Sequence, residues 1–209
     1  MDNRDTGPLR IVNVTSTEAP LWPQWLAIYH ESFPPEERMS VGWLQEQVEA
    51  GGRGEDALIL IAGLDHDAQA RAIAAYEHYP RQGAAALWYL AVQEHLRGHG
   101  LGQQIYAYVR SALAKENPRF LFYEVEIPGL RDDPGDHARR RIAWYRRLGA
   151  LQLHGIRYTQ QVDTVVSPLP MHLLVHPYQA VTAEEVYESL RGVLGDALQR
   201  DENAPLRLE

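Results

Sequence analysis

A glycine-rich turn between an apolar segment and an amphipathic segment is the part of this sequence best suited to bind a ligand. The apolar segment covers residues 84–92, the turn reads Arg97-Gly-His-Gly-Leu-Gly102, and helical spacing continues to about residue 115. Such a turn leaves backbone N–H groups unpaired at a helix N-terminus, where the macrodipole also favours negative charge. Glycine allows close approach and positive φ. The turn therefore predicts a phosphate site, and first of all a ligand with a pyrophosphate.

Two common phosphate-binding motifs do not fit this turn. The chain has one lysine, Lys115, which excludes a P-loop because that motif needs a lysine directly after its glycines. A dinucleotide fold carries G-x-G-x-x-G in its first β-α-β unit, whereas the spacing here is R-x-x-G-x-G after a fourth strand. The remaining alternative is a tight strand-to-helix turn without a ligand.

Three glutamates are candidate general bases. Glu124 and Glu126 alternate with an apolar residue in the strand predicted over residues 120–127, so both face the same side of a sheet. Burial there, beside a second carboxylate, would raise a pKa toward the range of a base. The alternative is a salt bridge to an arginine of the next helix. Glu77 is a third candidate, and a water-relayed base or a histidine stays open, namely His78 or His95.

The composition favours a cytoplasmic enzyme or binding module without a metal. The 209 residues support one domain with an appendage, and the net charge of −8 argues against nucleic-acid binding and favours a cationic ligand. The chain has no cysteine, no apolar run long enough to span a membrane, and a polar N-terminus. Its nine histidines form no H-E-x-x-H pair.

The hydrophobic pattern predicts the element order β-α-α-β-β-β-α-β-α-β-β-α, which indicates a mixed sheet with helices on both faces. Ser40 is expected to cap a short second helix. A polar loop is expected over residues 131–135, followed by a helix that Asp136 caps and that runs to Leu148, with Gly149 at the stop position. Strands are expected over residues 151–161 and 171–176, joined by a loop that contains Pro168 and Pro170. A capping box of Thr182 and Glu185 predicts a final helix. The tail from residue 201 is expected to be loose.

Two motifs in this order resemble the GNAT superfamily of N-acetyltransferases. Leu90-Ala-Val92 followed by Arg97-Gly-His-Gly-Leu-Gly102 is similar to its acetyl-CoA signature, R/Q-x-x-G-x-G/A. Arg141-Ile-Ala-Trp-Tyr-Arg-Arg-Leu-Gly-Ala150 resembles its second motif, a helix with tyrosine four residues before glycine. The element order from residue 9 to residue 176 is also similar. Two positions depart from the pattern: many members carry Asn at the place of Ala138, and Phe at that of Ala150.

The resemblance implies a GNAT-like α/β (α+β) fold. Its sheet would be mixed and mostly antiparallel, with helices on both faces and a splayed parallel pair formed by residues 84–92 and 120–127. Residues 1–178 would form the acetyltransferase domain. Residues 179–209 would add a C-terminal helix and tail, whose apolar stripe packs on the same domain or on the partner of a homodimer.

The resemblance also assigns roles to single residues. Acetyl-CoA would lie between the splayed strands, with its pantetheine arm on backbone groups near Leu90 and Val92. The Val92 N–H would stabilise the oxyanion. Tyr145 would protonate the leaving thiolate as general acid, although helical spacing alone favours a core aromatic there. The pyrophosphate would lie on the amides of the turn, namely Arg97, Gly98, His99, Gly100, Leu101 and Gly102.

The expected activity is the direct transfer of an acetyl group from acetyl-CoA to the primary amine of a small molecule or peptide. The amine would attack the thioester through a tetrahedral intermediate. No metal, nucleic acid or membrane is expected to take part. The alternative is a non-catalytic module that binds acyl-CoA as a sensor or interaction partner.

Overall fold

The computed structural model describes residues 7–52, 56–130, 136–160, 162 and 169–209. The chain forms two compact units. Unit 1 comprises Met1–His78 and Leu87–Glu116, and unit 2 comprises Tyr79–Ala86 and Asn117–Glu209. The strand β4 (Ala84–Val92) therefore begins in unit 2 and ends in unit 1.

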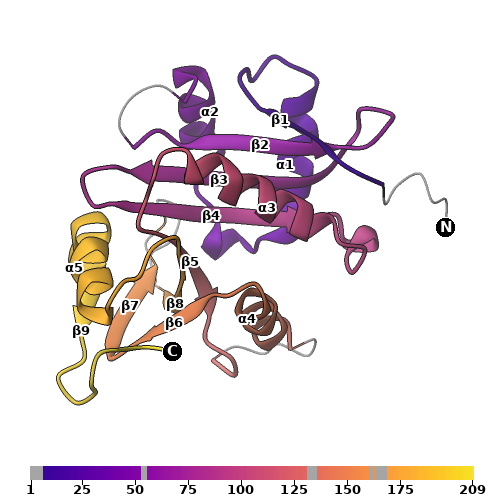
Figure 1. The fold of residues 1–209 in the computed structure, drawn as a ribbon. Coiled ribbons are helices and arrows are strands. Elements are labelled where there is room, and N and C mark those ends of the chain that lie inside the picture. Colours follow the sequence, from indigo (N-terminus) through magenta and orange to yellow (C-terminus); the bar gives the residue numbers. More distant parts are fainter. Residues whose placement is uncertain (1–6, 53–55, 131–135, 161, 163–168) are drawn as a thin grey trace. The chain divides into compact units, whose positions relative to one another are not determined.

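Unit 1 is built from strands covered by helices on both faces. Figure 1 shows α3 across one face and α1 behind the other. On the α1 side, the Trp25 indole N–H donates to the Ile61 carbonyl at 3.1 Å, and Trp25 and Tyr29 are fully buried. The elements of the unit are β1 (Arg10–Asn13), α1 (Leu21–Ser32), α2 (Val41–Ala50), β2 (Ile59–Leu64), β3 (Ala70–Tyr79), most of β4, and α3 (Leu101–Ala114).

Unit 2 holds two helices and the remaining strands. The α5 capping box is confirmed: the Thr182 hydroxyl accepts from the Glu185 N–H at 3.2 Å. Val186 and Leu190 have no exposed surface, whereas Val193 and Leu194 of the same helix are partly exposed. The elements are β5 (Phe120–Glu126), α4 (His137–Arg147), β6 (Leu151–His154), β7 (Ile156–Gln160), β8 (Leu169–Pro177), α5 (Ala183–Leu194), β9 (Leu198–Arg200) and β10 (Arg207–Leu208).

The strand order confirms the predicted fold class. The strands follow the order β1-β2-β3-β4-β5-β8-β6-β10, and β7 pairs with β8 and β9. The β5–β8, β6–β8 and β7–β8 pairs are antiparallel, as are β1–β2, β2–β3, β7–β9 and β6–β10. In contrast, β4 and β5 run parallel, with Ala84–Ala86 opposite Phe120–Phe122. No helix in the described ranges is long and apolar enough to cross a membrane.

The start of α4 differs from the prediction. Asp136 precedes the helix, but its side chain caps no backbone N–H, and its φ is +49°. Its carboxylate instead forms an ion pair with Arg139 at 3.2 Å. The end of the helix agrees with the prediction, since Gly149 follows it with φ +97°. The expected polar loop over residues 131–135 lies outside the described residues.

The strand predicted over residues 151–161 is wrong as a single element. Gly155 divides it into β6 and β7, because φ is +77° there and the backbone turns. The next strand begins at Leu169 rather than at residue 171 and includes Pro170, which was expected in the connecting loop. Residues 161 and 163–168 lie outside the description.

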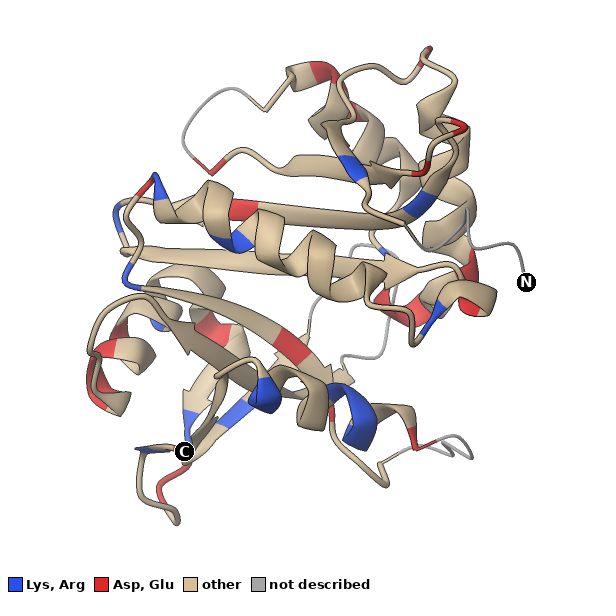
Figure 2. Ribbon diagram, turned by 45° about the vertical axis from the view of Figure 1, so that its right-hand side comes forward, with Lys and Arg blue, Asp and Glu red and all other residues tan. Residues whose placement is uncertain are grey.

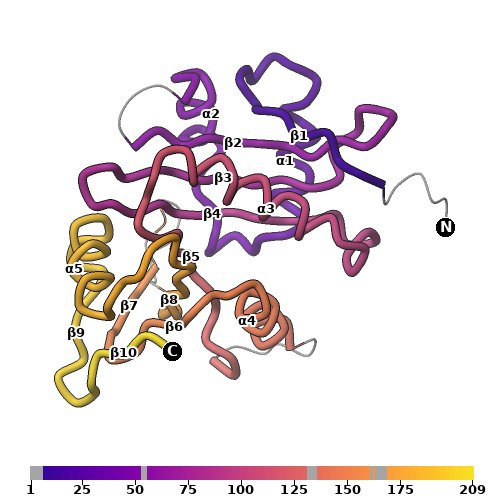
Figure 3. The backbone as a smooth tube through the Cα atoms, in the orientation of Figure 1, coloured from indigo at the N-terminus to yellow at the C-terminus, as the bar shows by residue number. Residues whose placement is uncertain are grey.

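The expectation of a loose C-terminal tail is also wrong. Figure 3 shows the last residues running beside β6, where they form β10. Glu209 and Gln152 exchange two backbone hydrogen bonds, with N–O distances of 3.1 and 2.6 Å. Because an edge strand presents unpaired N–H and C=O groups, β6 offers the tail a template that local sequence does not reveal.

Replacing Gly155 with Ala is expected to lower the free energy of unfolding by about 1–3 kcal/mol. A Cβ at this position would lie 2.5 Å from the Pro205 carbonyl oxygen, in addition to the cost of φ +77°. Urea unfolding measures the effect. Gly129→Ala is the control, because φ is +80° there and a Cβ would meet no described atom within 4 Å. Equal losses in the two variants would contradict the contact as the cause.

Candidate functional site

The glycine-rich turn connects β4 to α3 through a short 3-10 helix, Glu94–Leu96. Gly98 and Gly100 both have φ +83°, a region that residues with a Cβ rarely occupy. A Cβ at either position would meet no heavy atom of the described chain within 4 Å. Glycine is therefore required here by the backbone conformation, and the space in front of both residues is open.

The turn leaves a set of donors at the N-terminus of α3. Within the described ranges, the backbone N–H groups of residues 98–103 form no hydrogen bond to the chain, and the first turn of α3 has neither a side-chain cap nor an acidic residue. The macrodipole adds partial positive charge at the same end. These features suit a phosphate or pyrophosphate group.

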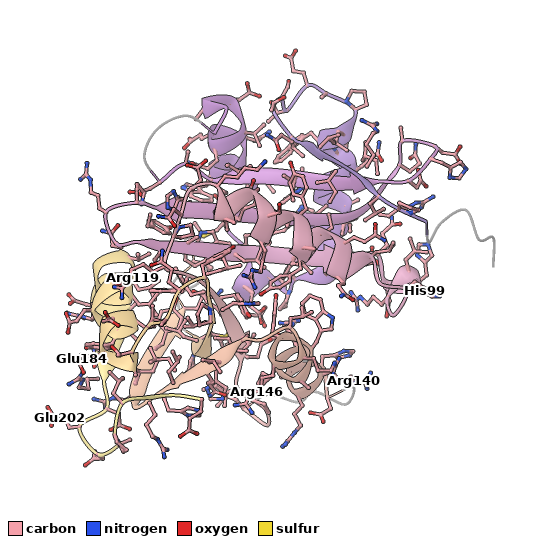
Figure 4. All side chains as sticks on the ribbon, in the orientation of Figure 1. His99, Arg119, Arg140, Arg146, Glu184 and Glu202 are labelled. Atoms are coloured by element: carbon pink, nitrogen blue, oxygen red, sulfur yellow. The ribbon has the colours of Figure 1, made fainter. Side chains whose placement is uncertain are left out.

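Side chains of the turn stabilise its shape. The Arg97 Nε–H donates to the Val92 carbonyl at 3.3 Å, which links the turn to the end of β4. His99 Nδ1 lies 3.2 Å from the Leu96 carbonyl, and Figure 4 labels this exposed side chain beside α3. Leu90 and Val92 lie beyond the residues at which β4 pairs with β5. Arg97 is thus placed to close the turn.

Of the three candidate bases, Glu77 and Glu126 have carboxylates that accept from a strong donor. Glu77 accepts from the Trp88 indole N–H at 2.6 Å within unit 1. Glu126 forms an ion pair with Arg141 of α4, which is the salt bridge that the sequence left as the alternative. Both carboxylates are thus already engaged by a side chain of the protein.

Glu124 has a different environment. The Tyr158 hydroxyl donates to one carboxylate oxygen, and the Gln160 side-chain N–H donates to the other at 2.6 Å. Burial raises the pKa of Glu124 to about 7, although both hydrogen bonds act to lower it. The cause is burial rather than the second carboxylate that the sequence suggested. Glu124 therefore changes its charge near neutral pH, as a general base must.

Sequence reasoning missed Tyr158 and Gln160. Their signal was two polar residues at alternate positions of a strand, but their target could not be read locally. In the structure Tyr158 is buried, and burial together with Glu124 raises the pKa of its phenol well above the usual range. Tyr158 therefore stays protonated and acts as a donor.

Tyr145 lies on the face of α4 that packs on β5. Its ring stacks on Tyr123 with centroids 4.0 Å apart and planes inclined by 29°, and it meets Trp144 edge-on at 4.8 Å. Tyr145 is 6% exposed. The stack would hold the ring in place in either of the two roles considered for Tyr145. The packing therefore agrees both with a general acid and with a core aromatic residue.

The sequence matches the acetyltransferase (GNAT) family over residues 22–150, more than half of the chain. The chain belongs to this family. GNAT proteins use acyl-CoA as co-substrate, and the matched region contains the glycine-rich turn, Glu124 and Tyr145.

Solved structures of GNAT proteins share the fold. A GNAT-family protein from Bacteroides thetaiotaomicron is 25% identical, with a TM-score of 0.67 and coverage of 88% of this chain and 95% of its own. The ribosomal-protein-S18-alanine N-acetyltransferase of Escherichia coli is 19% identical, with a TM-score of 0.55 and coverage of 83% and 96%. A Desulfovibrio desulfuricans protein of the family is 19% identical, with a TM-score of 0.57 and coverage of 81% and 98%. No curated protein matches the sequence.

Five arginines lie on α4, and Figure 2 shows this helix with blue segments; they are Arg139, Arg140, Arg141, Arg146 and Arg147. Arg141 and Arg139 are paired with Glu126 and Asp136, and Arg146 donates to the Gln152 side-chain oxygen at 3.3 Å. Figure 4 labels Arg140 and Arg146 on this helix. Three of these arginines therefore interact with side chains close to them, as is typical of a solvent-exposed helix face that is rich in charge.

One group of described residues brings three potential metal ligands together. Asp65, His66 and Asp67 have ligand atoms within 4.8 Å of one another at the β2–β3 turn. The Asp65 carboxylate, however, already accepts from Arg71 at 2.7 Å and from two backbone N–H groups at 2.9 Å. These bonds account for the cluster as a turn-stabilising motif.

Proposed function

We propose that this GNAT protein is an N-acetyltransferase that moves an acetyl group from acetyl-CoA to a primary amine of a small molecule or peptide. Family membership supplies the acyl-CoA co-substrate. The observation that favours catalysis over passive binding is Glu124, whose pKa of about 7 suits proton uptake at neutral pH. A sensor that only holds acyl-CoA needs no such group.

Residues of β4 and of the glycine-rich turn take the binding roles in this proposal. The amides of Gly98, His99, Gly100, Leu101 and Gly102 hold the pyrophosphate. The Arg97 N–H, which was also expected to do so, instead donates to the Glu94 carbonyl at 3.2 Å, so Arg97 closes the turn. Backbone groups at Leu90 and Val92 pair with the pantetheine arm, and the Val92 N–H donates to the oxyanion. Backbone donors suit this task because they are already oriented and need no reorganisation during the reaction.

Residues of β5 and α4 take the proton-transfer roles. The amine lone pair attacks the thioester carbonyl carbon and forms the C–N bond, and Glu124 accepts the proton that the nitrogen loses. The C–S bond then breaks, and the departing thiolate takes a proton from the Tyr145 hydroxyl. Glu126 and Glu77 are the lesser candidates for the base, because Arg141 and Trp88 hold their carboxylates.

Tyr145→Phe is expected to lower kcat by about tenfold to a hundredfold. The effect stays at the low end of general acid catalysis because a thiolate leaves readily without help. The affinity for CoA should change by less than about twofold, since Phe keeps the stack on Tyr123. Steady-state kinetics and calorimetry measure the two quantities.

Tyr123→Phe is the matched control, because it removes a hydroxyl from the same stacked pair. An equal loss of kcat in both variants would assign the effect to packing. A loss of CoA affinity in Tyr145→Phe would make that residue structural.

The proposal is tested by thiol release from acetyl-CoA and longer acyl-CoA thioesters in the presence of a panel of primary amines. The panel includes polyamines, aminoglycosides and basic peptides, because the net charge of −8 favours cationic acceptors. We expect release that depends on the amine and is fastest with the acetyl thioester. Tight CoA binding without release by any amine would support the sensor instead.

A further inference from the structure

Glu124, Tyr158 and Gln160 form a polar cluster on one face of the sheet in unit 2. Glu124 pairs with Leu173 across β5–β8, and Thr159 pairs with Pro170 across β7–β8. Because facing residues of antiparallel strands point to the same side, this register places Tyr158 and Gln160 on the face of Glu124. The surrounding residues of β8 on that face, Met171 and Leu173, are apolar. The cluster is thus a polar site in an apolar setting.

The hydrogen bonds of the cluster are incomplete in one specific place. Each oxygen of Glu124 accepts one hydrogen bond, from Tyr158 and from Gln160, and each can accept another. The side-chain oxygen of Gln160 is buried and has no partner among the described residues. A buried acceptor without a donor is unfavourable and calls for an explanation.

The orientation of the Gln160 amide follows from the charge of its neighbour. An ionised carboxylate only accepts hydrogen bonds, so the amide must turn its NH₂ group toward Glu124 and its oxygen away. The unpaired oxygen therefore belongs to the state in which Glu124 is ready to take a proton. In that state the cluster presents acceptors from two side chains and lacks a donor.

We propose that Glu124 and Gln160 together bind the acceptor amine through its two N–H groups, and that Tyr158 is a positioning residue which holds the Glu124 carboxylate in place. This inference rests on the proposed function and specifies its acceptor. One N–H of the amine donates to Glu124, which later takes the proton, and the other donates to the Gln160 oxygen. With both hydrogens held, the nitrogen lone pair points away from the cluster.

This arrangement discriminates between classes of amine. A neutral primary amine has two N–H groups and satisfies both acceptors, whereas a secondary amine has one and leaves the Gln160 oxygen or the Glu124 carboxylate unpaired. A site built to hydrogen-bond a substrate group rejects an analogue that lacks it, because its own buried polar atoms then stay unsatisfied. The chain should therefore prefer a primary amine over its N-methyl derivative.

Tyr158 sets the pH at which the site works. The hydrogen bond from Tyr158 lowers the pKa of Glu124, whereas burial raises this pKa. The resulting pKa is about 7. Among the described residues, Tyr79 also acts on Tyr158, and the Glu126–Arg141 ion pair lies at the end of β5. Without the Tyr158 hydroxyl, one of the hydrogen bonds that lower the pKa of Glu124 would be missing. The pKa would rise, and Glu124 would lose its proton only at higher pH.

The test compares Gln160→Met, Tyr158→Phe and the control Gln199→Met. Methionine keeps the length of Gln160 and removes both polar atoms, while Gln199 lies exposed on β9, which pairs with β7. We measure kcat/KM for a primary amine and its N-methyl derivative across pH. Gln160→Met should reduce the preference for the primary amine about tenfold or more. Tyr158→Phe should move the acid limb of the profile upward by about one pH unit. Gln199→Met should change neither.

An unchanged amine preference in Gln160→Met, or an equal loss of rate at every pH in Tyr158→Phe, would overturn the proposal. A readout independent of turnover is the NMR signal of the Glu124 carboxyl in ¹³C-labelled protein, titrated with methylamine and dimethylamine. A response to methylamine that Gln160→Met abolishes would support the amine site even if no amine were acylated, and only the proposed activity would then fail. No response in the wild-type protein would overturn the site itself.

Discussion

Glu124→Gln is expected to lower kcat by about 10²–10⁴-fold, the range for loss of a general base. Glutamine keeps the shape of the side chain and can still accept from Tyr158, but it cannot take the proton of the amine. In the wild-type protein kcat/KM should rise with pH through about 7, the pKa of Glu124, as the carboxyl loses its proton. The variant should lack this rise.

Glu126→Gln is the matched control on the same strand and the same face. It breaks the ion pair with Arg141, so a moderate effect on stability is expected, but the pH profile should keep its acid limb. Retention of more than about half of the wild-type rate in Glu124→Gln would exclude Glu124 as the base, given the expected size of the effect.

The stability of Glu124→Gln separates catalysis from folding. The folded protein holds the Glu124 proton to about pH 7, whereas the unfolded chain loses it near the ordinary value of 4.5. The contribution of Glu124 to the free energy of unfolding is therefore fully present below pH 4.5 and is lost as the pH rises through 7. Glutamine suffers no such loss. The inactive variant should be at least as stable as the wild-type protein at pH 8, which thermal unfolding would show.

Gly100→Asp is expected to weaken CoA binding by about a hundredfold or more, since it places a negative charge where the proposal puts the pyrophosphate. The structure itself leaves room for the side chain, because a Cβ at Gly100 would meet no described atom within 4 Å. The loss should therefore come from the ligand and not from misfolding.

Gly100→Asn isolates the charge. Asn and Asp have nearly the same shape and both tolerate positive φ, so the cost of φ +83° is shared. The Asn variant should lose only a few-fold in affinity by calorimetry. Equal affinities of the Asp and Asn variants for CoA would place the phosphate site elsewhere. Wild-type affinity in both variants would exclude the turn as a binding site for CoA.

Features that depend on neighbouring residues were predictable from the sequence. The Ser40 cap of α2, the Thr182–Glu185 box and the stop at Gly149 are local patterns, and each is present. The turn at residues 97–102 is local in the same sense, because glycine spacing reports the positive φ that it adopts.

Features that depend on pairing between distant segments were not predictable. The strand β10 forms because residues 207 and 208 pair with β6, and a strand of two residues is too short to show a hydrophobic period in the sequence. The partners of Glu124 depend on the register of β7 against β8. The sequence could show a carboxylate on an apolar strand but not which side chains would meet it.

The most direct test of the account is the fate of a ¹³C-labelled acetyl group. The protein is incubated with labelled acetyl-CoA and the amine that gives the fastest thiol release, and the products are examined by NMR. Direct transfer to the amine predicts that the label appears in an N-acetyl amide, in an amount equal to that of the free thiol. Label recovered as acetate, attached to the protein, or left in unreacted acetyl-CoA would contradict direct transfer to an amine.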